Sequence, residues 1–285
     1  MNVKKLPAVI SVVMMLMLSA PWSLQAERIG KLYVVGMGPA SPDLTAPRAL
    51  AVVEKADILL CSPRMPQRFA AFGSTIDPSK IAFDPWERVF DKNSENLKRT
   101  DPTAWAEAVD RRRREIQGFL LEKIKEGKTV AMMDGGDPCV YGPSLQYILK
   151  GFDDRLFEVI PGMGAVSAAA AALKRPLTTD DTRFVMLASY ESLFGEGPEP
   201  QEDLLRDISK YSHTLVLYMS LRSMKQLVER FSKYCPVDLP VAVVYFAGYA
   251  DKEQVIRGTL ANIEEQVRKV DEQWLGLVII GSAAR

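Results

Sequence analysis

Short apolar runs alternate with segments of helical spacing from residue 31 to the end of the chain. These runs are apolar on both faces, which is typical of strands in a parallel sheet that helices cover on both sides. We therefore expect an α/β fold. Strands are predicted at 31–36, 57–61, 129–133, 157–160, 184–188, 214–219, 241–246 and 275–280, and helices at 46–55, 102–126, 165–173, 202–210, 223–234 and 260–269.

The length of the chain sets the expected number of domains. At 285 residues it is long enough for two modest hydrophobic cores. Residues 150–155 are the expected linker, because they are polar and interrupt the alternation. The predicted organisation is an N-terminal segment at 1–26, one α/β domain at 27–150 and a second α/β domain at 151–285.

The first 26 residues have the pattern of an export signal. Lys4 and Lys5 precede an apolar run at 6–18, and small residues lead to a cleavage point after Ala26. An uncleaved membrane anchor is the competing interpretation, since residues 6–24 approach the ~20 residues that a spanning helix needs. Either interpretation places the folded part outside the cytoplasm, in the periplasm or another extracytoplasmic space.

The charge balance argues against two classes of partner. The 36 basic and 36 acidic residues cancel, whereas a surface for nucleic acid or for an anionic membrane needs an excess of basic residues. We therefore expect no nucleic-acid partner. Membrane contact is expected only if the N-terminal segment is an uncleaved anchor.

Neither metal nor histidine chemistry is indicated. Cys61, Cys139 and Cys235 follow no CxxC spacing, so the sequence predicts no metal site and no redox pair. We expect these cysteines to be buried as small apolar residues. His213 is the only histidine; it leads into an apolar run, so a structural role is expected before that of a general base.

Two glycine-containing turns follow predicted strands, where open α/β sheets bind their ligands. The segment 36–41 fits neither the dinucleotide fingerprint nor a P-loop, so phosphate binding is disfavoured. In Gly135-Gly136-Asp137-Pro138, glycine lets the backbone approach a ligand, and Asp137 offers an acceptor for hydroxyl or ammonium donors. A plain turn, in which Asp137 bonds to its own backbone, explains these residues equally well.

Several turns and strand ends form an ordered set from about residue 31 to the C-terminus. They are Val35-Gly36-Met37-Gly38-Pro39 with Ser41-Pro42-Asp43-Leu44, Ala56-Asp57, Gly135-Gly136-Asp137-Pro138 with Tyr141-Gly142, Val159-Ile160-Pro161-Gly162, Pro176-Leu177-Thr178, Leu217-Tyr218-Met219, Pro240-Val241-Ala242-Val243-Val244 and Arg257-Gly258-Thr259-Leu260. In this order they resemble the tetrapyrrole methylase family of S-adenosylmethionine-dependent methyltransferases. The resemblance is specific because of the shared order.

The resemblance implies two α/β domains with the cofactor S-adenosylmethionine in a cleft between them, usually in a homodimer. It also implies a tetrapyrrole-like small-molecule substrate and a place in porphyrin or corrin biosynthesis. No catalytic residue is assigned, because methyl transfer from a sulfonium needs alignment more than a dedicated nucleophile. Carried over position by position, the cofactor contacts are Pro39, Gly135, Gly136, Asp137, Val140, Gly164, Ala165, Met219 and Ala247.

A polyanionic tetrapyrrole would also need cations for its carboxylates. The candidates are Arg64, Arg68, Arg88 and the run at 111–114. That run lies on a predicted amphipathic helix, where most such arginines face solvent and one or two pack against neighbours.

The sequence departs from the uroporphyrinogen-methylating branch of the family. Cys61 and Ser62 stand where that branch has tyrosine and the aspartate proposed as its base, and a hydroxyl cannot replace a carboxylate as a base near neutral pH. Ala40 replaces a usual glycine, and Gly164 replaces a usual hydroxyl residue. Uroporphyrinogen III is therefore a poor first choice of substrate. A corrin-ring intermediate, another cyclic tetrapyrrole and a peptide amide are the open choices.

Other functions stay open beside the methyltransferase. An exported binding or carrier protein that kept the fold without catalysis is one, because S-adenosylmethionine is made in the cytoplasm and Ser62 and Gly164 depart from the family pattern. A peptide N-methyltransferase is another. A generic two-domain α/β protein ranks last, since chance does not supply so many turns in order.

Overall fold

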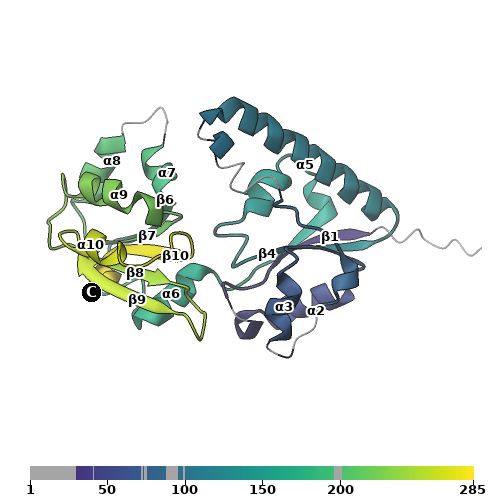
Figure 1. Cartoon of the computed structure of the whole chain (residues 1–285), viewed down its shortest axis with the longest axis horizontal. Helices are drawn as coiled ribbons and strands as arrows, with labels where there is room; N and C mark the ends of the chain where they lie inside the picture. The colour runs from purple at the N-terminus through teal and green to yellow at the C-terminus, as the bar shows by residue number, and fades with distance from the viewer. Residues whose placement is uncertain are drawn as a thin grey trace, which may run out of the picture.

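The computed structural model describes residues 30–40, 42–71, 73, 76–87, 96–98, 100–195 and 201–285. It has two α/β domains side by side, with helix α6 at their junction (Figure 1). The export segment predicted at 1–26 lies outside the described residues and stays a prediction. Within the described part of the chain, no helix is both long and apolar enough to cross a membrane.

The first sheet is parallel throughout, as the sequence predicts. Its order is β3-β2-β4-β1-β5. Neighbouring residues of one strand serve opposite faces: Val35 packs with the helices α2 and α3, and Val34 packs with α5. The elements are β1 (Lys31–Gly36), α2 (Pro47–Lys55), β2 (Ile58–Leu60), α3 (Met65–Ala70), β3 (Ile81–Phe83), α5 (Pro102–Lys125), β4 (Thr129–Asp134) and β5 (Phe157–Ile160).

The expected linker at 150–155 is misplaced. Strand β5 pairs in parallel with β1, with Val159 opposite Val34, so the chain stays in the first sheet until Ile160. Residues 150–155 form a polar surface turn that leads into this strand. Surface turns and linkers share the same polar composition, so composition alone placed the boundary too early.

The second sheet is mixed, which corrects the expectation of a second parallel sheet. Its order is β6-β7-β10-β8-β9, and only β6 and β7 are parallel. Strand β9 was not predicted. Only a short turn joins β8 to β9, and a connection without a crossover permits only antiparallel pairing. The strands are β6 (Phe184–Ser189), β7 (His213–Tyr218), β8 (Pro240–Tyr245), β9 (Gln254–Thr259) and β10 (Gly276–Gly281).

Helices cover both faces of this second sheet. One core lies against α9 and α10, and the other lies against α6. The helices are α6 (Ala165–Leu173), α7 (Tyr190–Phe194), α8 (Gln201–Ile208), α9 (Met224–Phe231) and α10 (Ile263–Val267). Short 3-10 turns lie at Pro42–Leu44, Pro78–Lys80, Asp154–Leu156, Leu221–Ser223 and Ser282–Ala284, and a π turn at Ser144–Ile148.

The cysteines follow the prediction in part. Cys61 and Cys235 are buried and free, but Cys139 is exposed, because it follows Pro138 in a surface turn rather than lying in a strand. His213 begins β7; it is buried, and its Nδ1 lies 2.8 Å from the carbonyl oxygen of Tyr211. No group of three metal-ligating side chains occurs among the described residues.

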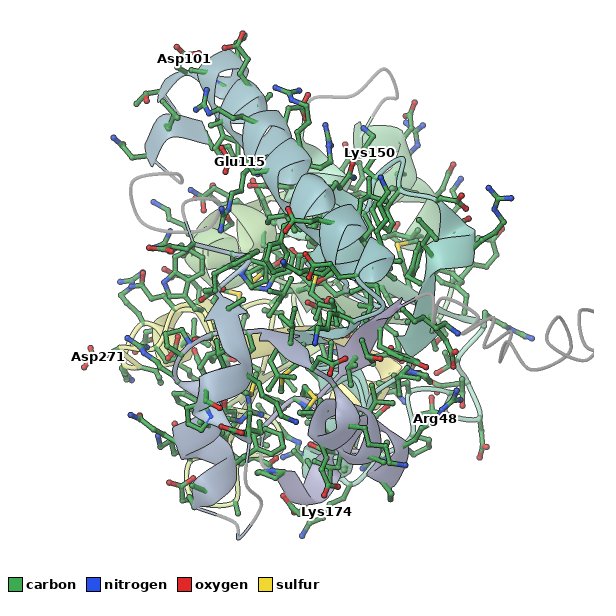
Figure 2. The ribbon with its side chains drawn as sticks, turned by 90° about the vertical axis from the view of Figure 1, so that its right-hand side faces the viewer. Arg48, Asp101, Glu115, Lys150, Lys174 and Asp271 are labelled. Atoms are coloured by element: carbon green, nitrogen blue, oxygen red, sulfur yellow. The ribbon has the colours of Figure 1, made fainter. Side chains whose placement is uncertain are left out.

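Charged side chains are spread over both domains. Asp101, Lys174 and Asp271 are exposed and lie at the outline of the molecule in Figure 2. On α5, Arg111 and Arg114 are exposed, whereas the other two arginines of the 111–114 run are partly buried. This distribution agrees with the expected solvated helix face.

Candidate functional site

Three loops at the carboxyl ends of β1, β4 and β5 pack backbone against backbone. A Cβ on Gly162 would lie 2.2 Å from the carbonyl oxygen of Gly136, and a Cβ on Gly36 would lie 2.5 Å from the amide nitrogen of Gly162. Gly38 and Gly136 exchange two backbone hydrogen bonds, of 3.2 and 2.7 Å. Only glycine permits this approach, so these residues join the loops into one rigid edge.

The turn after β4 is capped by its own aspartate. Asp137 Oδ1 accepts a hydrogen bond of 2.9 Å from the backbone N–H of Cys139, and its carbonyl accepts from the amides of Val140 and Tyr141. Gly135 is exposed with open space at its Cα, whereas Gly136 is buried. Asp137 therefore serves the turn and still has a second carboxylate oxygen.

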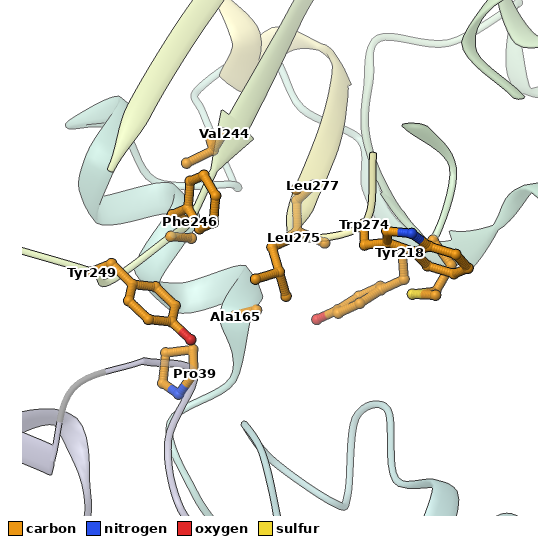
Figure 3. A pocket seen from close by; sticks show the side chains of 12 residues that line it. Pro39, Ala165, Tyr218, Val244, Phe246, Tyr249, Trp274, Leu275 and Leu277 are labelled. Atoms are coloured by element: carbon orange, nitrogen blue, oxygen red, sulfur yellow. The ribbon is translucent and has the colours of Figure 1, made fainter. Parts of the chain in front are cut away.

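A pocket lies beside these loops, between the two domains. The first domain contributes Pro39 after β1, and the second contributes the ends of β7 and β8 and the start of β10 (Figure 3). Its lining is largely apolar and aromatic, which is usual for sites that bind small molecules. The lining residues are Pro39, Ala165, Tyr218, Met219, Val244, Phe246, Ala247, Tyr249, Trp274, Leu275, Gly276 and Leu277.

The predicted cofactor contacts divide into two groups. Pro39, Ala165, Met219 and Ala247 line the pocket. The others, Gly135, Gly136, Asp137, Val140 and Gly164, lie in the adjoining loops and outside its lining.

Two contacts connect these loops to the pocket. The ring of Tyr141 stacks on that of the pocket residue Tyr218, with centroids 5.2 Å apart. A Cβ on Gly164, at the start of α6, would lie 3.7 Å from the Cβ of Asp137. The turn after β4 and the pocket thus form one continuous site.

Two pocket residues have unusual backbone conformations. Met219 has φ 52° and Phe246 has φ 49°, and they directly follow β7 and β8 respectively. Residues other than glycine adopt this left-handed conformation at a cost of roughly 1 kcal/mol or more. Such strain is typical of functional sites, and here it turns both chain segments along the pocket wall.

Tyr218 carries a buried hydroxyl at the pocket wall that donates a hydrogen bond to no described residue. Burial raises the pKa of this hydroxyl to about 12, with an opposing effect of the Val166 backbone amide and a smaller contribution from the negative charge of Asp137. The hydroxyl therefore stays protonated near neutral pH and is available to donate a hydrogen bond to a ligand.

Comparison with known proteins adds the family. The family model of tetrapyrrole (corrin/porphyrin) methylases matches residues 31–264. The chain belongs to the tetrapyrrole methylase family. This match spans the first sheet, the second sheet except β10, and every predicted contact residue. The pocket residues Trp274, Leu275, Gly276 and Leu277 lie beyond it.

Individual family members are similar to this chain along most of their length. A cobalt-precorrin-4 C(11)-methyltransferase of Priestia megaterium is 29% identical over 259 residues, covering 89% of this chain and 88% of that protein. A uroporphyrinogen-III C-methyltransferase of Methanocaldococcus jannaschii is 26% identical over 259 residues, covering 88% and 96%. A solved cobalt precorrin-4 methyltransferase, a cobalamin biosynthetic enzyme, has a TM-score of 0.68 at 25% identity, covering 90% of this chain and 96% of that chain.

The family motifs did not reveal the whole pocket. Tyr249 and Trp274 were not predicted; they come from the turn after β8 and the segment before β10. The guanidinium carbon of Arg222 lies 3.6 Å from the Trp274 ring centroid, a cation–π contact. An aromatic residue directly before a predicted strand is a weak signal, so only tertiary structure identifies these residues.

Asp134 is a second residue that the family motifs did not mark. It ends β4 directly before Gly135, is buried, and accepts a hydrogen bond from the Ser144 hydroxyl, while its Oδ2 has no partner. Burial raises its pKa from 3.8 to about 6. The folded state therefore holds a proton between about pH 4 and 6 that the unfolded state has lost, and stability falls as the pH rises through this window.

Asp134→Asn is expected to flatten this pH dependence. Between pH 4 and 7 the wild-type protein should lose up to about 3 kcal/mol relative to the variant, because one pKa unit corresponds to about 1.4 kcal/mol. Urea unfolding at pH 4.5, 5.5 and 7 measures the difference. Parallel pH profiles for the two proteins would contradict the raised pKa of this carboxyl.

Proposed function

We propose that the protein is an S-adenosylmethionine-dependent methyltransferase that acts on a cyclic tetrapyrrole. The observation that carries this proposal is the match of the tetrapyrrole methylase family model to residues 31–264. The pocket at the carboxyl ends of the strands, where that family's contact positions Pro39, Met219 and Ala247 meet, supports it.

The chemistry of the site suits the proposed cofactor. The apolar and aromatic lining suits a flat purine, and the Tyr218 hydroxyl can donate to a ligand acceptor. The carboxylate of Asp137 can accept from a hydroxyl or ammonium group. When bound, S-adenosylmethionine supplies a methyl group on a positively charged sulfur. The role of the protein is therefore to hold and orient the cofactor.

The rim of the site favours a large substrate with apolar faces. Tyr141, Met163 and Leu275 are large apolar side chains with 44%, 40% and 51% of their surface exposed. Tyr141 lies in the segment after β4, Met163 in the segment after β5, and Leu275 directly before β10. Grouped exposed apolar side chains usually mark a binding surface. A macrocycle presents a flat apolar face of this kind.

Among tetrapyrroles, we propose a corrin-ring precursor rather than uroporphyrinogen III. Ser62 follows β2 where the uroporphyrinogen-methylating branch has a carboxylate, and its Oγ accepts only a long hydrogen bond of 3.4 Å from the Arg64 amide. The Priestia megaterium relative and the solved structure with a TM-score of 0.68 act, by name, on cobalt-precorrin-4. Both observations favour the corrin branch.

Transfer of a labelled methyl group tests the proposal. The protein is incubated with methyl-labelled S-adenosylmethionine and, separately, cobalt-precorrin-4 and uroporphyrinogen III, and the macrocycles are analysed by mass spectrometry. We expect label on the corrin precursor. Ligand binding without label on any macrocycle would instead favour the carrier protein, and label on a peptide amide would favour the peptide N-methyltransferase.

Trp274 provides a direct report of ligand binding. It lines the pocket, whereas Trp86 packs against the core of the first domain and Trp105 lies on α5. Among the tryptophans that the structure describes, a ligand in the pocket should therefore change the emission of Trp274 most. We expect Trp274→Phe to remove most of the fluorescence change that S-adenosylhomocysteine produces, and Trp105→Phe to retain it. An unchanged response in Trp274→Phe would place the ligand elsewhere.

Export and homodimer formation are proposed on the sequence and the family resemblance. The signal pattern at 1–26 motivates the first, and protein found only in the cytoplasmic fraction of cells would contradict it. The family's usual assembly motivates the second. Light scattering at the mass of a single chain would contradict a homodimer.

A further inference from the structure

One partly buried cation near the pocket has two buried nitrogen atoms without an acceptor. Arg68 lies on α3 of the first domain, and its Nε and Nη2 are buried without a hydrogen-bond partner. Arg112 offers a contrast: its Nε is also unpaired, but its Nη1 donates to Glu115 at 3.4 Å and its Nη2 to the Asp84 carbonyl at 3.3 Å. Arg112 is thus held by protein groups, and Arg68 is not.

Arg68 meets the second domain at the pocket wall. Its guanidinium carbon lies 5.6 Å from the ring centroid of Tyr249, which lines the pocket. Figure 3 shows the Tyr249 hydroxyl directed toward Pro39, the pocket residue that the first domain contributes. Tyr249 therefore contacts Arg68 and also lines the pocket, so the guanidinium lies close to the pocket wall.

The turn that carries Tyr249 is firmly placed. The Gly248 amide donates to Glu253 Oε2 at 2.7 Å, and a Cβ on Gly248 would lie 2.8 Å from Leu44 Cδ1 of the first domain. This turn is therefore fixed by contacts from both domains, so the Tyr249 ring lies beside Arg68 before any ligand arrives.

A buried charge without a counter-ion costs free energy, and proteins keep one where a ligand supplies the opposite charge. Burial lowers the pKa of Arg68, although an arginine stays charged at neutral pH. Its planar fork of N–H donors matches a carboxylate with two parallel hydrogen bonds. Because the Tyr249 ring covers one face of the guanidinium, the N–H groups along its edge are the ones that can bind an anion.

We propose that Arg68 binds a carboxylate of the ligand in this pocket and thereby fixes the ligand's orientation. This inference rests on the proposed function, which supplies two sources of that carboxylate. One is the amino-acid end of S-adenosylmethionine, and the other is an acidic side chain of the tetrapyrrole. The chemistry is the same in both cases, and the ligands tested below separate them.

Calorimetric titration of the full chain and of Arg68→Met provides the test. The probes are S-adenosylhomocysteine, 5′-methylthioadenosine, which lacks the amino-acid carboxylate, and uroporphyrin III in the presence of S-adenosylhomocysteine. The loss of a charge-assisted carboxylate contact is expected to weaken binding by about tenfold or more. Arg48→Met is the matched control, because Arg48 lies on α2 of the same domain, is exposed and pairs with Glu158 rather than with a ligand.

The pattern of losses decides the outcome. Weaker S-adenosylhomocysteine binding in Arg68→Met, with 5′-methylthioadenosine unchanged, supports the cofactor carboxylate. Weaker uroporphyrin binding alone supports the tetrapyrrole carboxylate. Unchanged binding of all probes overturns the proposal. An equal loss for both adenosyl compounds also overturns it, because that result shows that Arg68 only stabilises the contact between the two domains. If the wild-type protein binds neither adenosyl compound, the proposed function itself fails.

Discussion

Gly162→Ala is expected to destabilise the protein by about 3 kcal/mol or more and to abolish detectable ligand binding. The new Cβ would lie 2.2 Å from the carbonyl oxygen of Gly136 and 2.9 Å from the backbone of Gly36. All of these atoms belong to backbone, so no side-chain rotation can relieve the clash. The loops after β1, β4 and β5 would have to separate, and the edge that frames the pocket would open.

Thermal unfolding measures the first part of this prediction. A loss of this size lowers the melting temperature by roughly 5–10 °C. Gly118→Ala is the matched control: Gly118 lies in α5 with no atom near its Cα, so alanine should stabilise the helix by about 0.5–1 kcal/mol. Equal melting temperatures for Gly162→Ala and the wild-type protein would show that the three loops are not in contact.

Asp137→Ala is expected to weaken S-adenosylmethionine binding by about 10–100-fold, because a hydrogen bond to a charged group contributes roughly 1.5–3 kcal/mol. Structure and sequence leave two roles for this residue. Its Oδ1 holds the turn through the Cys139 amide, at 2.9 Å, and its carboxylate also accepts from the Cys139 thiol; its second oxygen is the further acceptor that a ligand could use. Calorimetric titration measures the affinity, and thermal unfolding measures the contribution to the turn.

A matched control separates these two roles. Asp153 accepts the same type of bond, of 3.0 Å from the Arg155 amide, in a turn outside the site. We expect Asp153→Ala to leave the affinity unchanged. If Asp137→Ala lowers stability like Asp153→Ala but binds S-adenosylmethionine as the wild-type protein does, the carboxylate serves the turn alone.

The first domain could be predicted from sequence to a large extent. Its strands are buried on both faces, so they have continuous apolar runs such as 129–133, and Asp101 caps a helix whose apolar spacing is clear. The second sheet was harder. Strand β9 carries Arg257 and Gly258 and lies at the sheet edge, so neither its composition nor its pattern marks it.

The same distinction applies to the site. Pro39 and Met219 lie in segments that the family resemblance marks, and they line the pocket. Tyr249 and Arg68 meet only because the turn after β8 packs against the first domain, a contact between residues far apart in the chain. Local sequence patterns report turns and strand ends; they do not report which distant side chains complete a pocket.

The decisive experiment is calorimetric titration of the purified protein with S-adenosylmethionine and S-adenosylhomocysteine. We expect saturable binding of both compounds at one site per chain, with lower affinity in Asp137→Ala. Absence of binding at millimolar concentration in a folded protein would contradict it. The pocket between Pro39 and Met219 would then have been retained for a different ligand.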